Sequence, residues 1–138
     1  MKITKKYIND LAYKIIGCAI EVHKHLGPGL LESIYEKCFL KELEIQGLSY
    51  INQINVPLNY KGLQIDNDLR LDVLVENLVC VELKAQDALI PVHDAILLSY
   101  MHMLEQPKGL LINFRCTNIF KYGQKAFVNH YFSTFPED

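Results

Sequence analysis

Residues 69–84 read LRLDVLVENLVCVELK, and this stretch decides the fold. Apolar residues alternate with polar ones on both sides of Asn77; they are Leu69, Leu71, Val73 and Val75 before it, and Val79, Val81 and Leu83 after it. Such alternation is typical of strands with one buried face. Because asparagine tolerates the left-handed backbone of a tight turn, the stretch predicts an antiparallel hairpin turning at Asn77.

A hairpin centred on Asn77 brings three charged residues together. Asp72 lies opposite Glu82, and Lys84 follows on the same face of the second strand. Two carboxylates in contact repel each other, so we expect a counter-charge, and a hard divalent cation such as Mg²⁺ or Mn²⁺ suits oxygen ligands. The Lys84 ammonium could orient an attacking water or offset charge on a phosphoryl oxygen. A solvated strand face with a Glu–Lys pair is the alternative interpretation.

The segments around this hairpin alternate between helical and strand-like patterns. The spacing predicts helices over 5–25, 30–46 and 92–104, a β-rich segment over 50–60, a buried strand over 109–114, and strand plus irregular structure over 119–135. In the second helix we expect Leu31, Ile34, Cys38 and Leu43 to point inward. This order predicts the α/β class, with a central mixed β-sheet flanked by α-helices.

Length and composition narrow the class of protein. The 138 residues, half of them hydrophobic, predict one globular domain over 1–138. A net charge of −2 removes the simplest argument for a nucleic-acid or anionic-membrane binder. No stretch approaches the roughly 18 apolar residues that would span a bilayer, so we expect no membrane partner and a cytoplasmic location. The four scattered cysteines predict reduced packing residues.

A third carboxylate lies near the start of the second predicted helix. Glu32 follows the break at Gly27-Pro28-Gly29, and Tyr35 comes nearly one turn later on the same face. A glutamate favoured by the helix dipole and a tyrosine half-buried at the rim of the core are the structural alternatives for these two residues.

Four short motifs together resemble a known family. The run GLLESIY at 29–35 resembles the name-giving motif of the GxxExxY protein family, and the likeness continues through LDVLVENLVCVELKA and HDAILLSYM to GLLINF, about residues 15–114. That family is placed in the PD-(D/E)XK nuclease superfamily. The resemblance implies a restriction-endonuclease-like core and a nuclease that cleaves DNA or RNA with Mg²⁺ or Mn²⁺.

The same resemblance implies roles for individual residues. Asp72 matches the motif aspartate, and Glu82 and Lys84 match the acid and the lysine of E-x-K. The backbone carbonyl of Leu83 would bind the metal, and Glu32 would complete its ligand shell.

Substrate positioning is assigned to three further residues, Tyr35, His93 and Tyr100. In this branch a Q-x-x-x-Y motif is expected on the helix after the hairpin, where the glutamine is associated with positioning nucleic acid or the metal-bound shell. Here Ile96 takes the place of the glutamine and Tyr100 is retained. The alternative for Ile96 is a core position, because it begins an apolar run.

Two functions follow from these patterns. The first is a metal-dependent nuclease, for which Lys108, Arg115, Lys121 and Lys125 could contact the phosphate backbone; surface solvation is the alternative for these cations. The second is a non-catalytic nucleic-acid- or protein-binding module that retains the nuclease fold. The mild acidity and Ile96 favour the module, whereas three carboxylates converging with a lysine favour the enzyme. The sequence does not indicate the oligomeric state.

Overall fold

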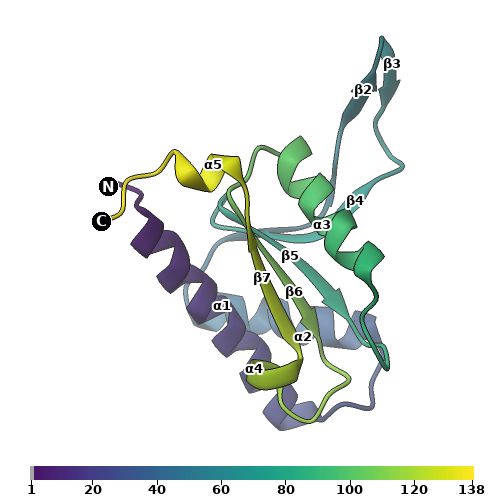
Figure 1. Ribbon diagram of the computed structural model, residues 1–138. Helices are drawn as coiled ribbons and strands as arrows, with labels where there is room; N and C mark the ends of the chain where they lie inside the picture. Colours follow the sequence, from purple (N-terminus) through teal and green to yellow (C-terminus); the bar gives the residue numbers. More distant parts are fainter. Residues whose placement is uncertain (1) are drawn as a thin grey trace.

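A five-stranded mixed sheet forms the centre of the computed structural model, which describes residues 2–138 (Figure 1). Its strands, in spatial order, are β1 (Tyr50–Asn55), β4 (Arg70–Val75), β5 (Val79–Lys84), β6 (Lys108–Asn113) and β7 (Gln124–Val128). Strands β5 and β6 are parallel, and the other neighbouring pairs are antiparallel. The predicted α/β class with a mixed sheet is confirmed.

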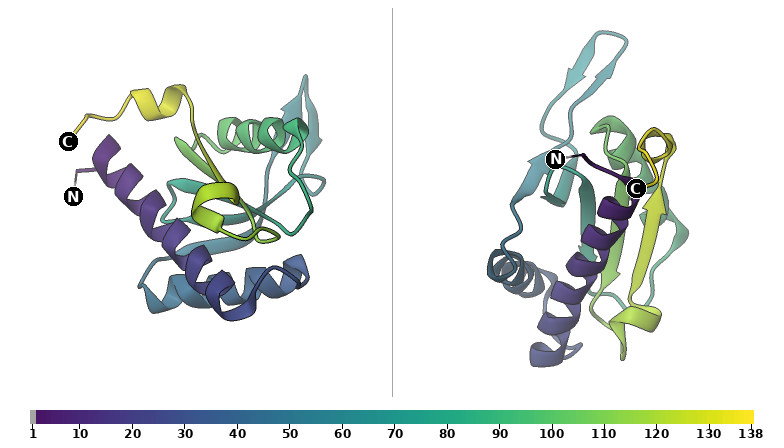
Figure 2. Two further views of the ribbon diagram at one scale, coloured as in Figure 1. Left: turned by 60° about the horizontal axis from the view of Figure 1, so that its bottom comes forward. Right: turned by 90° about the vertical axis from the view of Figure 1, so that its left-hand side faces the viewer.

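Helices cover both faces of the sheet, and a small hairpin projects beyond it (Figures 1 and 2). One face packs on α1 (Lys5–Leu26) and α2 (Glu32–Ile45), and the other on α3 (Pro91–Met103). The projecting hairpin consists of β2 (Leu58–Tyr60) and β3 (Leu63–Ile65). The segment predicted as strand plus irregular structure contains α4 (Ile119–Tyr122), β7 and α5 (His130–Ser133).

Helix α1 follows its predicted pattern closely. Thr4 caps its start, since the Thr4 hydroxyl oxygen accepts a hydrogen bond from the Tyr7 amide at 2.9 Å. Gly27 ends the helix with a φ of 72°, a left-handed conformation that glycine adopts without a steric penalty. All the expected apolar residues are buried, namely Ile8, Leu11, Ala12, Ile15, Ala19 and Val22.

Helix α2 turns a different face inward from the one we predicted. Its buried residues are Tyr35, Phe39 and Leu43, whereas Leu31 is 72% exposed. Of the predicted inward set, Leu43 is buried and the half-buried Cys38 packs against the core, whereas Ile34 is exposed. Tyr35 and Phe39 belong to the core cluster between this helix, α1 and the sheet, and tertiary packing therefore overrode the apolar pattern.

The β4–β5 hairpin turns over 76–78, and Asn77 has a φ of 51°, as expected. The prediction of one buried face is wrong, because both faces are covered. Leu74 and Cys80 pack with α3, while the alternate valines pack with α1 and α2. Leu71 and Val73 would share a face in a regular strand, yet Leu71 joins the α3 side and Val73 the α1–α2 side. Strand β4 therefore changes face at Asp72.

Helix α3 connects the parallel strands β5 and β6. It lies directly on β6 because Gly109 has no side chain: a Cβ atom there would collide with the Met101 sulfur and crowd Leu97. Because β5 and β6 are parallel, their carboxyl ends lie at the same edge of the sheet. Lys84 pairs with Asn113 at that edge.

The two ends of the described chain lie together (Figure 1). The backbone amides of Lys5 and Lys6 donate to the carbonyl oxygens of Pro136 and Glu137, at 2.8 and 3.2 Å. These bonds satisfy amides of the first turn of α1 that have no partner within the helix. Among residues 2–138, no helix has the length and apolar character needed to cross a membrane.

Candidate functional site

Four of the predicted site residues, Asp72, Glu82, Leu83 and Lys84, lie on the β4–β5 pair, close to the carboxyl edge of the sheet. The observed pairing places Val73 opposite Val81, and the adjoining residues Asp72 and Glu82 are linked by a hydrogen bond from the Asp72 amide to the Glu82 carboxylate. Lys84 is the last residue of β5, and its carbonyl oxygen accepts from the Phe114 amide at 2.8 Å. The register expected from the Asn77 turn is confirmed.

The Asp72 and Glu82 carboxylates are each held by a backbone amide of the opposite strand. The Asp72 amide donates to Glu82 Oε1 at 3.0 Å, and the Leu83 amide donates to Asp72 Oδ2 at 2.8 Å. These bonds take the place of ladder hydrogen bonds where the two strands separate. Each carboxylate is therefore fixed through one oxygen by the backbone of its neighbour.

The surroundings of Asp72 and Glu82 disfavour the charged form of both carboxylates. Glu82 is only 7% exposed. Its pKa is raised to about 7 by burial and then by repulsion from Asp72, while the Asp72 amide and Lys84 act in the opposite direction. Burial likewise raises the pKa of Asp72, opposed by the Leu83 amide and Lys84. An acidic pair of one buried and one half-buried residue with raised pKa values is typical of a functional site, because added positive charge would stabilise it.

Glu32 and Lys84 approach this pair from two elements. Glu32 lies in the exposed first turn of α2, and partial burial raises its pKa, with Lys84 opposing and Asp72 adding repulsion. Lys84 is half-buried, and none of the ion pairs within 4 Å among residues 2–138 includes it. Its effect on the acidic residues is therefore electrostatic over a longer distance.

The donor set suits a hard divalent cation, although it is not assembled as a finished shell. Asp72, Glu82 and Glu32 offer the carboxylate oxygens that Mg²⁺ and Mn²⁺ prefer. Burial and repulsion from the other two carboxylates disfavour the negative charge of Glu82. Within residues 2–138, no three acidic, histidine or cysteine side chains already stand around one point as metal ligands. Asp72 and Glu82 are linked by a hydrogen bond, whereas Glu32 interacts with Glu82 only by electrostatic repulsion over a longer distance.

Two residues that the sequence did not single out extend the acidic cluster. Glu36 lies one turn after Glu32 on α2, and its pKa is raised by burial and then by Asp72. The Gln53 side-chain amide donates to Glu36 Oε1 at 2.8 Å and reaches Asp72 Oδ1 at 3.5 Å. The helical spacing of Glu32 and Glu36 was a usable signal for Glu36, whereas no local pattern marks Gln53.

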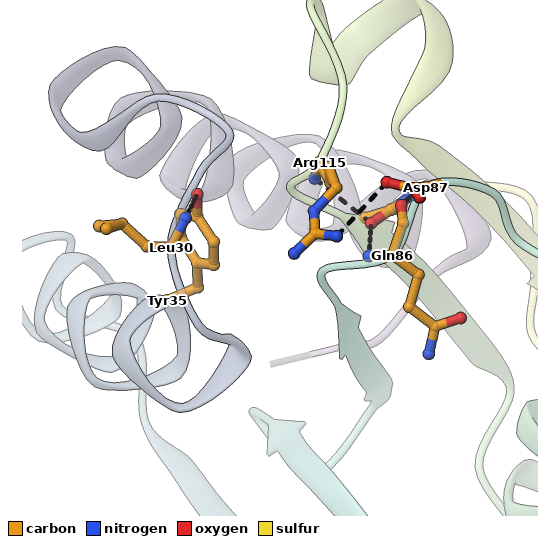
Figure 3. A network of polar contacts seen from close by, with 6 residues as sticks. Leu30, Tyr35, Gln86, Asp87 and Arg115 are labelled. Carbon is orange, nitrogen blue, oxygen red and sulfur yellow. Dashed lines mark hydrogen bonds and ion pairs between the residues drawn. The ribbon is translucent and has the colours of Figure 1, made fainter.

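Tyr35 is fully buried beneath the loop that leads into α2 (Figure 3). Its hydroxyl donates to the Gly27 carbonyl and accepts from the Leu30 amide at 3.1 Å. Its ring stacks on Phe114 with centroids 4.4 Å apart. With no exposed surface, Tyr35 can influence a substrate only through this loop, which leads directly to Glu32.

The three α3 residues take different positions. Tyr100 is half-buried, and its pKa is raised by burial and then by the charge of Glu82. His93 is half-buried in the first turn of α3, where its Nδ1 accepts from the Ile90 amide at 3.3 Å. Ile96 is 38% exposed, so the alternative of a core position is wrong; Leu97, the next residue, fills the core instead.

A polar pocket lies beyond Lys84 at the same edge of the sheet, and its lining includes Asp87, Asn113, Arg115, Thr117, Tyr122 and Lys125. The buried Asn113 side chain accepts from the Gln86 amide and donates to the Gln86 carbonyl, fixing the segment after β5. The Arg115 guanidinium points toward Asp87 and forms an ion pair with it at 3.3 Å (Figure 3). Lys125 pairs with Asp94 at 3.2 Å.

Comparison with known proteins gives one positive result. A family model described as the PD-(D/E)XK nuclease superfamily matches residues 9–125, which include every residue of the acidic cluster and Lys84. No curated protein and no solved structure matches the chain.

Proposed function

The chain belongs to the PD-(D/E)XK nuclease superfamily, and from this premise we propose that it is a metal-dependent phosphodiesterase that cleaves DNA or RNA. The observation that carries the proposal is the acidic pair of half-buried Asp72 and buried Glu82, held by amides of opposite strands, with Lys84 at the end of β5. We further propose that the chain belongs to the GxxExxY family, because residues 29–35 carry that motif and its glutamate, Glu32, interacts electrostatically with Asp72 and Lys84.

The proposed cation site consists of Asp72, Glu82, the Leu83 carbonyl and Glu32. Mg²⁺ or Mn²⁺ supplies positive charge for a phosphoryl oxygen and lowers the pKa of a water molecule when bound. The protein contributes two carboxylates whose orientation is already fixed by backbone amides. Glu32 lies on an exposed helix turn, so its side chain is free to adjust to the ion.

Lys84 is the positively charged side chain that acts on the three carboxylates of the proposed cation site. Its ammonium group lies at the end of β5, near Asp72, Glu82 and Glu32 but paired with none of them at short distance. An ammonium in this place stabilises negative charge that grows on the phosphoryl group as the water attacks. Lys84 is therefore the residue proposed to assist the reaction without being needed for the cation.

The strand of nucleic acid would run along the carboxyl edge of the sheet, between the acidic pair and the pocket at Arg115. Arg115 and Lys125 are paired with aspartates in exposed ion pairs, which contribute little stability and can be exchanged for phosphate contacts. Tyr100 and His93 lie on the α3 side of the pair and are proposed to position the substrate.

Cleavage of labelled single- and double-stranded DNA and RNA, with Mg²⁺, Mn²⁺ or EDTA, tests the proposal. We expect products with one of the two cations and none in EDTA, and we expect Asp72→Asn and Lys84→Ala to lower the rate sharply. Lys61→Ala, at the tip of the projecting hairpin, is the matched control and should retain the wild-type rate. Equal cleavage by wild type and Asp72→Asn would show that the activity belongs elsewhere.

A non-catalytic binding module is the second candidate, and Ile96 favours it. An exposed isoleucine stands where related nucleases have the glutamine that handles substrate or the metal-bound shell. An apolar side chain offers no hydrogen bond to a phosphate or a base. Binding of the same nucleic acids without any metal-dependent cleavage would support this function over the enzyme.

A further inference from the structure

Gln53 has an unusual backbone for a residue inside a strand. Its φ is 53°, in the left-handed region that side chains other than glycine seldom adopt. The β1–β4 pairing includes Asn52 with Val73 and Ile54 with Leu71, and Gln53 and Asp72 are the residues that lie between these two pairs. The irregularity in β1 therefore lies directly beside the point where β4 changes face.

The Gln53 side chain links two acidic residues from different elements. Its Nε2 atom donates to Glu36 Oε1 on α2 at 2.8 Å and lies 3.5 Å from Asp72 Oδ1 on β4. A glutamine amide has two N–H donors on one nitrogen, so one group can serve both carboxylates. Asn52 also stabilises Glu36, and the Leu83 amide stabilises Asp72, but Gln53 is the donor that contacts both carboxylates.

We propose that Gln53 is a positioning residue that holds the Asp72 carboxylate, together with Glu36, in the orientation required by the acidic site. The backbone amide of Leu83 holds Asp72 Oδ2, and Gln53 orients Oδ1, so the two contacts together fix the rotation of the carboxylate. Glycine would fit the backbone of position 53 better. The functional gain from glutamine therefore lies in its side chain, in keeping with strained residues clustering at functional sites.

The consequence for metal binding rests on the proposed function, whereas the orientation of Asp72 does not. Hydrogen-bonding partners of metal ligands typically change metal affinity or activity by about 10–100-fold when they are removed. Gln53 should act in this way, through Asp72 rather than by touching the cation or the substrate. Its loss is expected to lower kcat with little effect on KM.

The test uses two variants and one matched control. Gln53→Met keeps the length of the side chain and removes the donor, and Gln53→Gly also removes it while relaxing the backbone. Gln64→Met removes a comparable amide–carboxylate hydrogen bond, from Gln64 to Asp66 at 3.0 Å in the projecting hairpin. If Gln53→Met does not fold, Gln53→Gly still decides the question.

The first measurement is the NMR signal of the Leu83 amide in EDTA, because this amide donates to Asp72. We expect the signal to shift in both Gln53 variants and to stay in place in Gln64→Met. The second measurement is Mn²⁺ affinity by calorimetry, which should fall by about 10–100-fold in the Gln53 variants only.

The outcomes separate this proposal from the proposed function. An unchanged Leu83 signal in the Gln53 variants overturns the positioning role, whatever the metal affinity. A shifted signal with wild-type Mn²⁺ affinity also overturns the role, since the orientation would then have no consequence for the site. If the wild-type protein binds no Mn²⁺, the metal-dependent function fails, and the Leu83 signal alone decides whether Gln53 positions Asp72.

Discussion

The backbone amide of Asp72 holds the Glu82 side chain in place across the β4–β5 pair, donating to a Glu82 carboxylate oxygen at 3.0 Å. The bond uses an amide that would otherwise belong to the ladder between the strands. It fixes a buried glutamate whose charged form is disfavoured by burial. Beyond the paired residues of β4 and β5, the two acidic side chains are therefore held close together although burial disfavours their charge.

Removing the Lys84 ammonium should slow cleavage and spare metal binding. We expect Lys84→Ala to lower the rate by about 10²–10³-fold, the usual effect of losing one preorganised electrostatic group. Lys84→Arg should rescue poorly, because a planar guanidinium does not reproduce a compact ammonium. Single-turnover cleavage and Mn²⁺ calorimetry provide the two readouts. Wild-type rates in both variants would remove Lys84 from the reaction.

The metal-free protein should lose stability as the pH rises. The pKa of Glu82 is about 7 in the folded protein against an ordinary 4.5, so the folded state retains the proton over this interval and unfolding releases it. Stability therefore falls as the pH rises from about 4.5 through 7, by on the order of 3 kcal/mol from this group. Asp72, Glu32 and Glu36 act in the same direction.

Thermal unfolding in EDTA between pH 5 and pH 8 measures this effect. Glu82→Gln removes the titrating group and keeps an oxygen for the Asp72 amide, so its Tm should fall less over the interval. Mn²⁺ at pH 8 should raise the Tm of the wild-type protein and raise it less in Glu82→Gln. A wild-type Tm that rises with pH over this range would contradict the raised pKa.

Ile96→Gln should improve substrate handling at little cost in stability. Ile96 is 38% exposed, so a polar amide there does not have to be buried. We expect tighter nucleic-acid binding or faster cleavage with unchanged Mn²⁺ affinity. Leu98→Gln is the matched control, because Leu98 is equally exposed on α3 and lies on a different side of the helix. An equal gain in both variants would show that an amide anywhere on the exposed side of α3 has this effect.

Arg115 should contribute one phosphate contact. We expect Arg115→Ala to weaken binding of single-stranded oligonucleotides in EDTA and to reduce the salt slope of log Kd by about one. Lys24→Ala is the control, since Lys24 is an exposed cation paired with Glu21 on α1. Fluorescence anisotropy at several salt concentrations gives the slope. An unchanged slope in Arg115→Ala would place the strand away from this pocket.

Tyr35→Phe should destabilise the protein through the loop before α2. The variant keeps the stacking on Phe114 and loses the hydroxyl that joins Gly27 to Leu30. We expect a loss of about 1–3 kcal/mol in the free energy of unfolding, read from urea midpoints at constant slope. Tyr13→Phe, at a position 66% exposed, should be neutral. A neutral Tyr35→Phe would mean that the loop does not depend on these bonds.

The sequence alone determined the features that depend on short-range patterns. The turn at Asn77 and the alternation on both sides of it specify the register that sets Asp72 opposite Glu82, because a hairpin leaves few ways to pair its strands. The apolar stripe of α1 and its end at Gly27 were equally readable, since both depend on residues within a few turns of one helix. The α/β class followed from the order of such elements.

Only the tertiary structure decided which distant groups meet. Which face of α2 is buried depends on the space beside the sheet, which Tyr35 and Phe39 fill. Gln53 reaches Glu36 and Asp72 because β1 and β4 pair across an intervening hairpin, and its left-handed φ redirects the chain at that residue. A contact of this kind depends on the folding of the whole sheet, and no pattern within a few neighbouring residues encodes it.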